Sequence, residues 1–259
     1  MSGADWRGGA TAVLVLLGLF VIWEIAVRAL GVKPIILPPP STVWLEFWSD
    51  PVWYLRHGWY TLLVTVAGFG LAVVVGVLLA VLIVESKVME KTVYALIVGM
   101  NSVPKVAVAP LFVIWLGTGV EPKIAIGFLI AVFAIVIDTV LGLKSVHPDI
   151  LDLARSLRGG RMATLWRIRF PCALPSLFAG MKVAISLALV GAIVGEFVSS
   201  QRGLGYVILS AQGTFDTARV FAAIMVLAVM GVVLFWLVAI AERFAIPWHS
   251  SQKEYSPTA

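Results

Sequence analysis

The sequence contains few charged side chains and almost no cysteine. Only 13% of its 259 residues are charged and 61% are hydrophobic, whereas a soluble domain carries about 25% charged residues. A soluble core of this size cannot bury so much apolar surface, so we expect the chain to be dissolved in a bilayer. The single cysteine, Cys172, excludes an intramolecular disulfide and a cysteine-based metal cluster.

The sequence also lacks the patterns of an ATP-binding or metal-binding protein. No G-x-x-x-x-G-K-[ST] segment occurs in it, so any ATP hydrolysis has to come from another subunit. The three histidines, His57, His147 and His249, lie in three different polar segments rather than at the spacing of metal ligands. We therefore expect no enzymatic activity and no cofactor in this chain.

The net charge of +5 does not indicate a nucleic-acid partner. The charged residues lie at the ends of apolar runs rather than along one polar face, and such a distribution is typical of residues that set membrane topology. Tryptophans gather in the segment 44–59 with only one basic residue, Arg56, among them. A platform for stacking nucleic-acid bases would need interleaved basic residues there.

Long apolar runs predict an all-α, polytopic membrane protein with about six spanning helices, since a span needs about 20 residues. The expected spans are 10–30, 61–84, 92–116, 124–143, 177–199 and 220–241. We expect a single transmembrane domain over 1–259. Its parts are an N-terminal helix and interfacial segment (1–60), a core (61–241) that contains a polar elbow (152–175), and a polar tail (242–259).

Two segments interrupt this pattern. Prolines at 34 and 38–40 end the first span, and Ser41 is the expected N-cap of a short amphipathic helix whose indole rings lie at the headgroup level. The third span is broken by the polar segment 101–105, which contains Pro104, and by Pro110. Such breaks occur where protein or a water-filled cavity satisfies the backbone.

The elbow is the most polar passage between two apolar runs, with five arginines beside one acid, Asp152. We expect a helix over 152–157 with this acid at its N-terminal side, a sharp turn at Gly159 and Gly160, and a second helix over 161–170 that ends or bends at Pro171. Lysines and arginines are in excess on this side, which predicts a cytoplasmic elbow and two cytoplasmic termini.

The elbow resembles the EAA loop of the permease subunits of binding-protein-dependent ABC importers, where E-A-A is followed by three residues, a glycine, nine residues and I-x-L-P. The matching positions are Asp152, Leu153 and Ala154 for E-A-A, with Ile168, Phe170 and Pro171 for I-x-L-P. Arg158 stands at the glycine position, and Gly159 and Gly160 follow it. The segments 37–41, 103–117 and 195–206 are similar to the nitrate, sulfonate and taurine branch of these permeases.

This resemblance implies an all-helical permease in the inner membrane that forms a dimer with a second copy. It also implies two cytoplasmic ATPase subunits, which bind ATP and Mg, and a periplasmic or lipid-anchored solute-binding protein. The residues to which it assigns ATPase coupling are Asp152, Leu153, Ala154, Arg155, Ser156, Arg158, Gly159, Gly160, Arg161, Ile168 and Pro171.

Polar residues within spans are the candidates for a translocation pathway. They are Asn101, Ser102, Lys105, Asp138, Lys182, Ser186 and Glu196. Lys105 has two readings that the sequence leaves open, because it either favours an anionic solute in the pathway or pairs with Asp138.

The predicted function is ATP-driven import, by alternating access, of a small anionic or polar solute such as a sulfonate, nitrate or taurine. The first alternative is a secondary transporter or channel that works without an ATPase, for which an internal repeat would be expected. The second is a membrane-embedded enzyme, which would need clustered catalytic side chains within its spans.

Overall fold

The computed structural model describes residues 3–86, 88–89, 91–92, 99, 103–157 and 159–248, and all regular structure in these ranges is helical. The helices at the N-terminal half are α1 (Gly3–Ala29), α2 (Pro40–Ser49), α3 (Pro51–Glu85), α5 (Lys105–Leu116) and α6 (Glu121–Lys144). Those that follow are α7 (Pro148–Ser156), α8 (Arg161–Thr164), the π-helical turn η1 (Leu165–Arg169), α9 (Phe170–Ser199), α10 (Leu204–Gly213) and α11 (Thr217–Ala245).

Four helical segments in the described ranges are long and apolar enough to cross a membrane. They are α3, α6, the continuous segment α8–η1–α9 and α11. These segments confirm the spans expected at 61–84, 124–143, 177–199 and 220–241, and with them the all-α membrane class. The expected break near Pro104 is also confirmed, because the backbone is not helical at 103–104 and α5 begins at Lys105. The expected break at Pro110 was wrong, because Pro110 lies inside α5.

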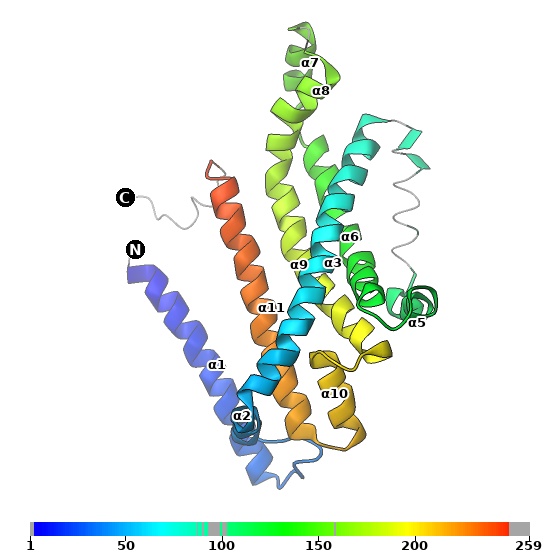
Figure 1. Cartoon of the computed structure of the whole chain (residues 1–259). Helices are drawn as coiled ribbons and strands as arrows, with labels where there is room; N and C mark the ends of the chain where they lie inside the picture. Colours follow the sequence, from blue (N-terminus) through cyan, green and yellow to red (C-terminus); the bar gives the residue numbers. More distant parts are fainter. Residues whose placement is uncertain are drawn as a thin grey trace.

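The core forms where α6 packs between α3 and α9, and small residues allow this close packing (Figure 1). A Cβ atom on Gly191 of α9 would lie 2.6 Å from the Cα of Gly127 on α6. On α3, a Cβ atom on Gly76 would lie equally near the side chain of Ile135. Larger residues at these positions would force the helices apart, so the glycines set the spacing of the bundle.

The elbow projects from one end of the bundle, whereas α2 and α10 lie at the opposite end, which we call the far end (Figure 1). Helix α1 stands apart from the other spans along most of its length (Figure 1). It is joined to the bundle at the far end, where Trp23 contacts Phe221 with ring centroids 5.7 Å apart.

Two expectations about the segment 31–60 were wrong. Helix α3 begins at Pro51, ten residues earlier than expected, because the Asp50 carboxylate caps it by accepting from the Trp53 amide at 3.0 Å. The tryptophans at 53 and 59 therefore lie on a spanning helix rather than on the short interfacial one.

Ser41 does not cap α2, because its amide and hydroxyl donate to Glu24 at 3.0 and 2.8 Å and α2 begins at Pro40. Glu24 also forms an ion pair of 2.6 Å with Arg28, one helical turn further along α1.

The helix does not end at Pro171, which was one of the two outcomes expected there, because it runs without interruption from Arg161 to Ser199. Proline normally breaks a helix by removing a donor and by crowding the carbonyl four residues earlier. Here η1 widens the helix immediately before the proline, and the Phe170 amide bonds to the Leu165 carbonyl five residues back. The wider turn accommodates Pro171 inside a continuous helix.

Candidate functional site

The elbow is a helix–turn–helix that exposes several large apolar side chains. Leu153 and Leu157 are one helical turn apart, and their side chains are 59% and 75% exposed. Met162 and Trp166 extend the exposed apolar surface into the second half of the elbow. We call these four residues the elbow tip. Contiguous apolar surface that a protein leaves exposed usually marks an interaction site.

Helix α7 starts earlier than the sequence predicts, and this changes the position of Asp152. The helix begins at Pro148, and the ring of His147 caps it by accepting from the Asp149 amide at 3.4 Å. Asp152 therefore lies in the middle of α7 rather than at its N-terminal side, and its carboxylate pairs with Arg155 at 2.6 Å. Both side chains of this pair are exposed.

The turn between α7 and α8 confirms the predicted place of the bend and shows which glycine it needs. The Gly159 amide donates to the Ala154 carbonyl at 2.9 Å, and a Cβ atom on Gly159 would lie 2.8 Å from that oxygen. Gly160 has φ −64° and open space around it. The requirement at Gly159 is thus close approach rather than an unusual φ angle. Arg158 lies outside the described residues.

The second half of the elbow is anchored in the core of the bundle. Leu165 is buried there among residues of α3, α6 and α9. Ile168 and Pro171 are half-buried on the same continuous helix. Because α8, η1 and α9 form one helix, the second half of the elbow is a rigid extension of a spanning segment.

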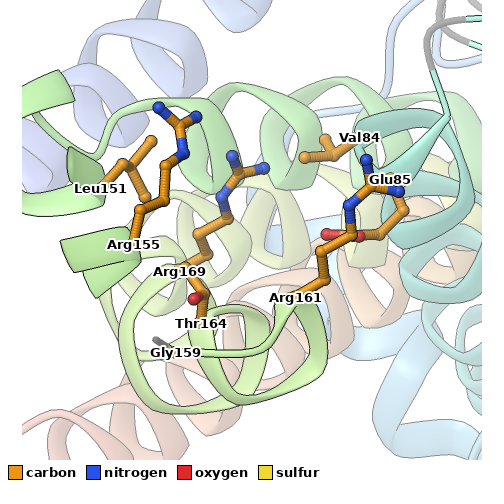
Figure 2. Close-up of a pocket in the computed structure, with 8 residues that line it drawn as sticks. All are labelled: Val84, Glu85, Leu151, Arg155, Gly159, Arg161, Thr164 and Arg169. Carbon is orange, nitrogen blue, oxygen red and sulfur yellow. The ribbon is translucent and has the colours of Figure 1, made fainter. Parts of the chain in front are cut away.

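A pocket of about 300 Å³ opens between the elbow and the end of α3 (Figure 2). Three arginine side chains reach it from α7, α8 and η1, and Glu85 is the one acid among its described lining residues. The lining residues are Val84, Glu85, Leu151, Arg155, Gly159, Arg161, Thr164 and Arg169.

The described pathway candidates are spread over α5, α6 and α9. Lys105 starts α5, and its Nζ lies 4.6 Å from the ring centroid of Phe133. Asp138 is half-buried on α6 and packs against Gly180 of α9. Asn101 and Ser102 lie outside the described residues. The pathway roles of these four residues stay predictions.

The three candidates on α9 have different surroundings. Lys182 forms an ion pair of 2.5 Å with Glu242 of α11, Ser186 is exposed, and Glu196 is fully buried. Sequence reasoning missed the pair with Glu242, because nothing in the sequence indicates that α9 and α11 lie side by side here.

A buried polar cluster at the far end surrounds Glu196. Its carboxylate accepts from the Thr61 hydroxyl at 2.8 Å and from the Gly205 amide at 2.7 Å. Thr61 in turn accepts from the Leu204 amide at 2.9 Å. We call Thr61, Glu196 and the backbone of 203–205 the Glu196 cluster. The glycines at 203 and 205 are its one signal in the sequence.

Gly203 is held in a conformation that favours glycine. Its φ is +103°, and a Cβ atom on it would overlap the Glu196 carboxylate. Its amide donates to Nδ1 of His57 on α3 at 3.1 Å. The loop that follows α9 is thus bonded to both α3 and α9, and the Glu196 cluster fixes the start of α10.

Two neighbouring cavities open at the far end, with volumes of about 760 and 530 Å³. Tyr60, Gln201 and Arg202 line both of them. Lys123 lines the larger cavity and Arg56 the smaller, and no carboxylate is among the described residues that line either one. Lys123 is only 2% exposed, and its Nζ donates to the carbonyls of residues 118 and 119. The walls of both cavities therefore favour negative charge.

The part of the chain that the structure describes contains no group of three or more histidine, cysteine, aspartate or glutamate side chains arranged to hold a metal ion. The functional candidates among the described residues are the elbow with its pocket, the Glu196 cluster and the far-end cavities.

Comparison with known proteins places the chain among transport proteins. Residues 72–246 match the family model described as binding-protein-dependent transport system inner membrane component. The formylaminopyrimidine transport permease protein ThiX of Halalkalibacterium halodurans is 33% identical over 92% of this chain and 96% of its own length. The taurine transport system permease protein TauC of Escherichia coli is 30% identical over 93% of this chain and 88% of its own length.

A solved structure supports the fold. A chain of the MetNI methionine ABC transporter, crystallised in inward-facing conformations, superposes with a TM-score of 0.66 at 19% identity. The match covers 74% of this chain and 96% of that chain.

Proposed function

Because this chain belongs to the family of binding-protein-dependent transport system inner membrane components, we propose that it forms the translocation pathway of an ATP-driven importer and is driven through its elbow. Family membership makes it a multi-pass permease subunit of an ABC transport system in the inner membrane. The observation that carries the coupling proposal is the exposed apolar elbow tip, two of whose residues, Met162 and Trp166, lie on a helix that continues into the core.

The elbow tip has the properties of a docking knob for separate ATPase subunits. Leu153 on α7 and Leu157 directly after it are largely exposed, and α7 projects beyond the end of the helical bundle (Figure 1). An apolar groove on each ATPase subunit would bury these side chains, at about 25 cal/mol per Å² of apolar surface removed from water.

Motion at the elbow tip would reach the spans because the parts are rigidly joined. The second half of the elbow is continuous with α9, Leu165 is buried in the core, and α9 packs closely on α6 through glycine contacts. A push on the tip therefore tilts α9 and α6 together. This is the mechanical requirement of alternating access, in which each nucleotide state of the ATPase favours one permease conformation.

The proposed orientation puts the elbow and both termini in the cytoplasm and the Glu196 cluster on the outer side. The arginine-rich elbow supports it, because lysine and arginine are in excess on cytoplasmic segments. The importer then comprises two copies of this chain, two ATPase subunits that bind ATP and Mg, and an outer solute-binding protein that delivers the cargo.

A small anionic or polar solute fits the far-end cavities. Their described walls carry Arg56, Arg202 and Lys123 without a carboxylate, so the mouth of the pathway attracts anions. The cargoes for which the two relatives are named, taurine and formylaminopyrimidine, are both small and polar. A sulfonate, nitrate or taurine-like solute is therefore the proposed cargo class.

Purification of the tagged full chain from its native membrane tests the coupling. ATP-hydrolysing subunits should co-purify with the unmodified chain and with Leu153→Met, which keeps the tip apolar. They should be lost with Leu153→Asp, and transport in proteoliposomes should require ATP inside. Solute transport by the purified chain alone, driven by an ion gradient, would instead establish the secondary-transporter alternative.

A further inference from the structure

The pocket behind the elbow brings together more positive charge than its described lining residues neutralise. Arg155, Arg161 and Arg169 enter it from three consecutive elements, as Figure 2 shows. Like charges confined to a small pocket repel one another, and a bound anion relieves that repulsion. We propose that this pocket binds a phosphate group, with a planar guanidinium as its principal ligand.

Charge accounting within the site indicates a singly charged anion. The three arginines contribute +3, while Glu85 in the pocket wall and Asp152, which pairs with Arg155 at 2.6 Å, contribute −2. The described site therefore carries a net charge of +1. A phosphodiester carries one negative charge and would neutralise this site.

The burial and the hydrogen-bonding groups of the lining side chains suit an oxyanion site. Arg169 is half-buried, and in the described part of the chain no carboxylate forms an ion pair with it. Guanidinium groups bind phosphate oxygens through two parallel hydrogen bonds, and Thr164 adds a hydroxyl donor to the same wall. Arg155 already bonds to Asp152 at 2.6 Å, and both of these side chains are largely exposed.

The position of the pocket relative to the bundle indicates where the phosphate comes from. Val84 and Glu85 are the last residues of the apolar helix α3, and Arg169 directly precedes α9. The pocket thus lies at the boundary of the spanning region. Basic pockets between spanning helices on the cytoplasmic side bind the headgroups of anionic lipids. Under the proposed orientation, a phosphatidylglycerol headgroup reaches this pocket, and free phosphate is the second source of the same chemistry.

A phosphate bound in the pocket would contact both α3 and the elbow and so connect them. The walls of the pocket come from α3 on one side and from α7, α8 and η1 on the other. A bound phosphate would therefore restrict movement of the elbow relative to α3. Because the inference rests on the proposed orientation, its test is kept separate from ATPase binding.

Native mass spectrometry of the purified full chain tests the site, with phosphatidylglycerol, phosphatidylcholine and inorganic phosphate as the probes. Arg169→Gln should weaken phosphatidylglycerol binding about tenfold, because a charge-assisted bidentate contact is lost. Arg167→Gln is the matched control, since Arg167 lies on the same turn but outside the pocket lining. Glu85→Gln should strengthen binding about threefold by removing the one acid of the wall.

Binding of phosphatidylglycerol over phosphatidylcholine, sensitive to Arg169 and insensitive to Arg167, supports a lipid headgroup as the source. Competition by inorganic phosphate at millimolar concentration, with the same pattern among the variants, supports free phosphate at the same site.

Equal loss with both arginine variants, or no binding of either probe, overturns the proposal. Displacement of the bound lipid by added ATPase subunits would show that a partner side chain fills the pocket in the assembly, which also overturns it. Retention of ATPase subunits by Arg169→Gln, together with their loss from Leu153→Asp, separates this result from the coupling proposal.

Discussion

The hydroxyl of Thr61 donates a 2.8 Å hydrogen bond to the buried carboxylate of Glu196, although 135 residues separate the two in the chain. The same hydroxyl accepts from the Leu204 amide, so one side chain joins α3, α9 and the start of α10. The Glu196 cluster therefore adds buried hydrogen bonds to the apolar packing at the far end of the bundle.

Replacing Thr61 with valine should destabilise the protein by about 1–3 kcal/mol, because a buried carboxylate oxygen and a backbone amide lose their partner. The measurement is the thermal transition of the purified protein in detergent. Thr65→Val is the matched control, one turn along α3 and equally buried, since its hydroxyl bonds only to the Thr61 carbonyl. Equal destabilisation by the two variants would contradict a special role of the cluster.

Gly203→Ala should reduce the amount of folded protein in the membrane. Its positive φ is strained for alanine by about 1–3 kcal/mol, and the methyl group would overlap the Glu196 carboxylate. Gly213→Ala, at the end of α10, meets open space and an ordinary φ, so its folded amount should stay unchanged. Quantified expression in isolated membranes distinguishes the two, and normal levels of Gly203→Ala would disprove the overlap.

The two glycines of the elbow should differ in their tolerance to alanine. A methyl group on Gly159 would press against the Ala154 carbonyl and open the turn, whereas one on Gly160 meets nothing within 4 Å. We expect Gly159→Ala to lower the amount of solute moved per ATP hydrolysed at least threefold, and Gly160→Ala to leave it unchanged. The ratio is measured in proteoliposomes that contain the assembled transporter. A reversed order of the two variants would place the critical turn residue at Gly160.

The ion pair between Lys182 and Glu242 predicts non-additive effects. Each single variant, Lys182→Met or Glu242→Gln, leaves a partly buried charge without its partner and should cost about 1–3 kcal/mol of stability. The double variant should be more stable than the sum of the singles predicts, by about 1 kcal/mol or more. Thermal unfolding of the four proteins gives the coupling energy. Additive losses would indicate that Lys182 acts on its own, as a pathway residue would.

Much of the fold could be predicted from the sequence because apolar length alone defines a span. The limits of α6 and α11 differ from the expected ones by only a few residues, since charged or polar residues flank both apolar runs. The start of α3 was missed because tryptophans are compatible with both an interfacial and a spanning helix. The continuity through Pro171 was missed because a π-helical turn leaves no mark in composition.

Some features of the candidate site could likewise be predicted from the sequence, and others could not. The place of the elbow and its turn followed from polar residues and glycines that are close together in the sequence. The Glu196 cluster and the pair of Lys182 with Glu242 depend on which helices lie side by side, and local patterns carry no such information. Gly159 was expected to serve a sharp turn, but its contact with the Ala154 carbonyl became visible only in three dimensions.

The uninterrupted helix from Arg161 to Ser199 carries the elbow on one end and Glu196 on the other. At 1.5 Å per residue its 39 residues span about 58 Å. Each residue also turns the helix by about 100°, so a single insertion between Pro175 and Gly191 would rotate the elbow by that angle relative to Glu196. The number of residues between these two ends therefore sets the direction in which the elbow points, as well as its reach.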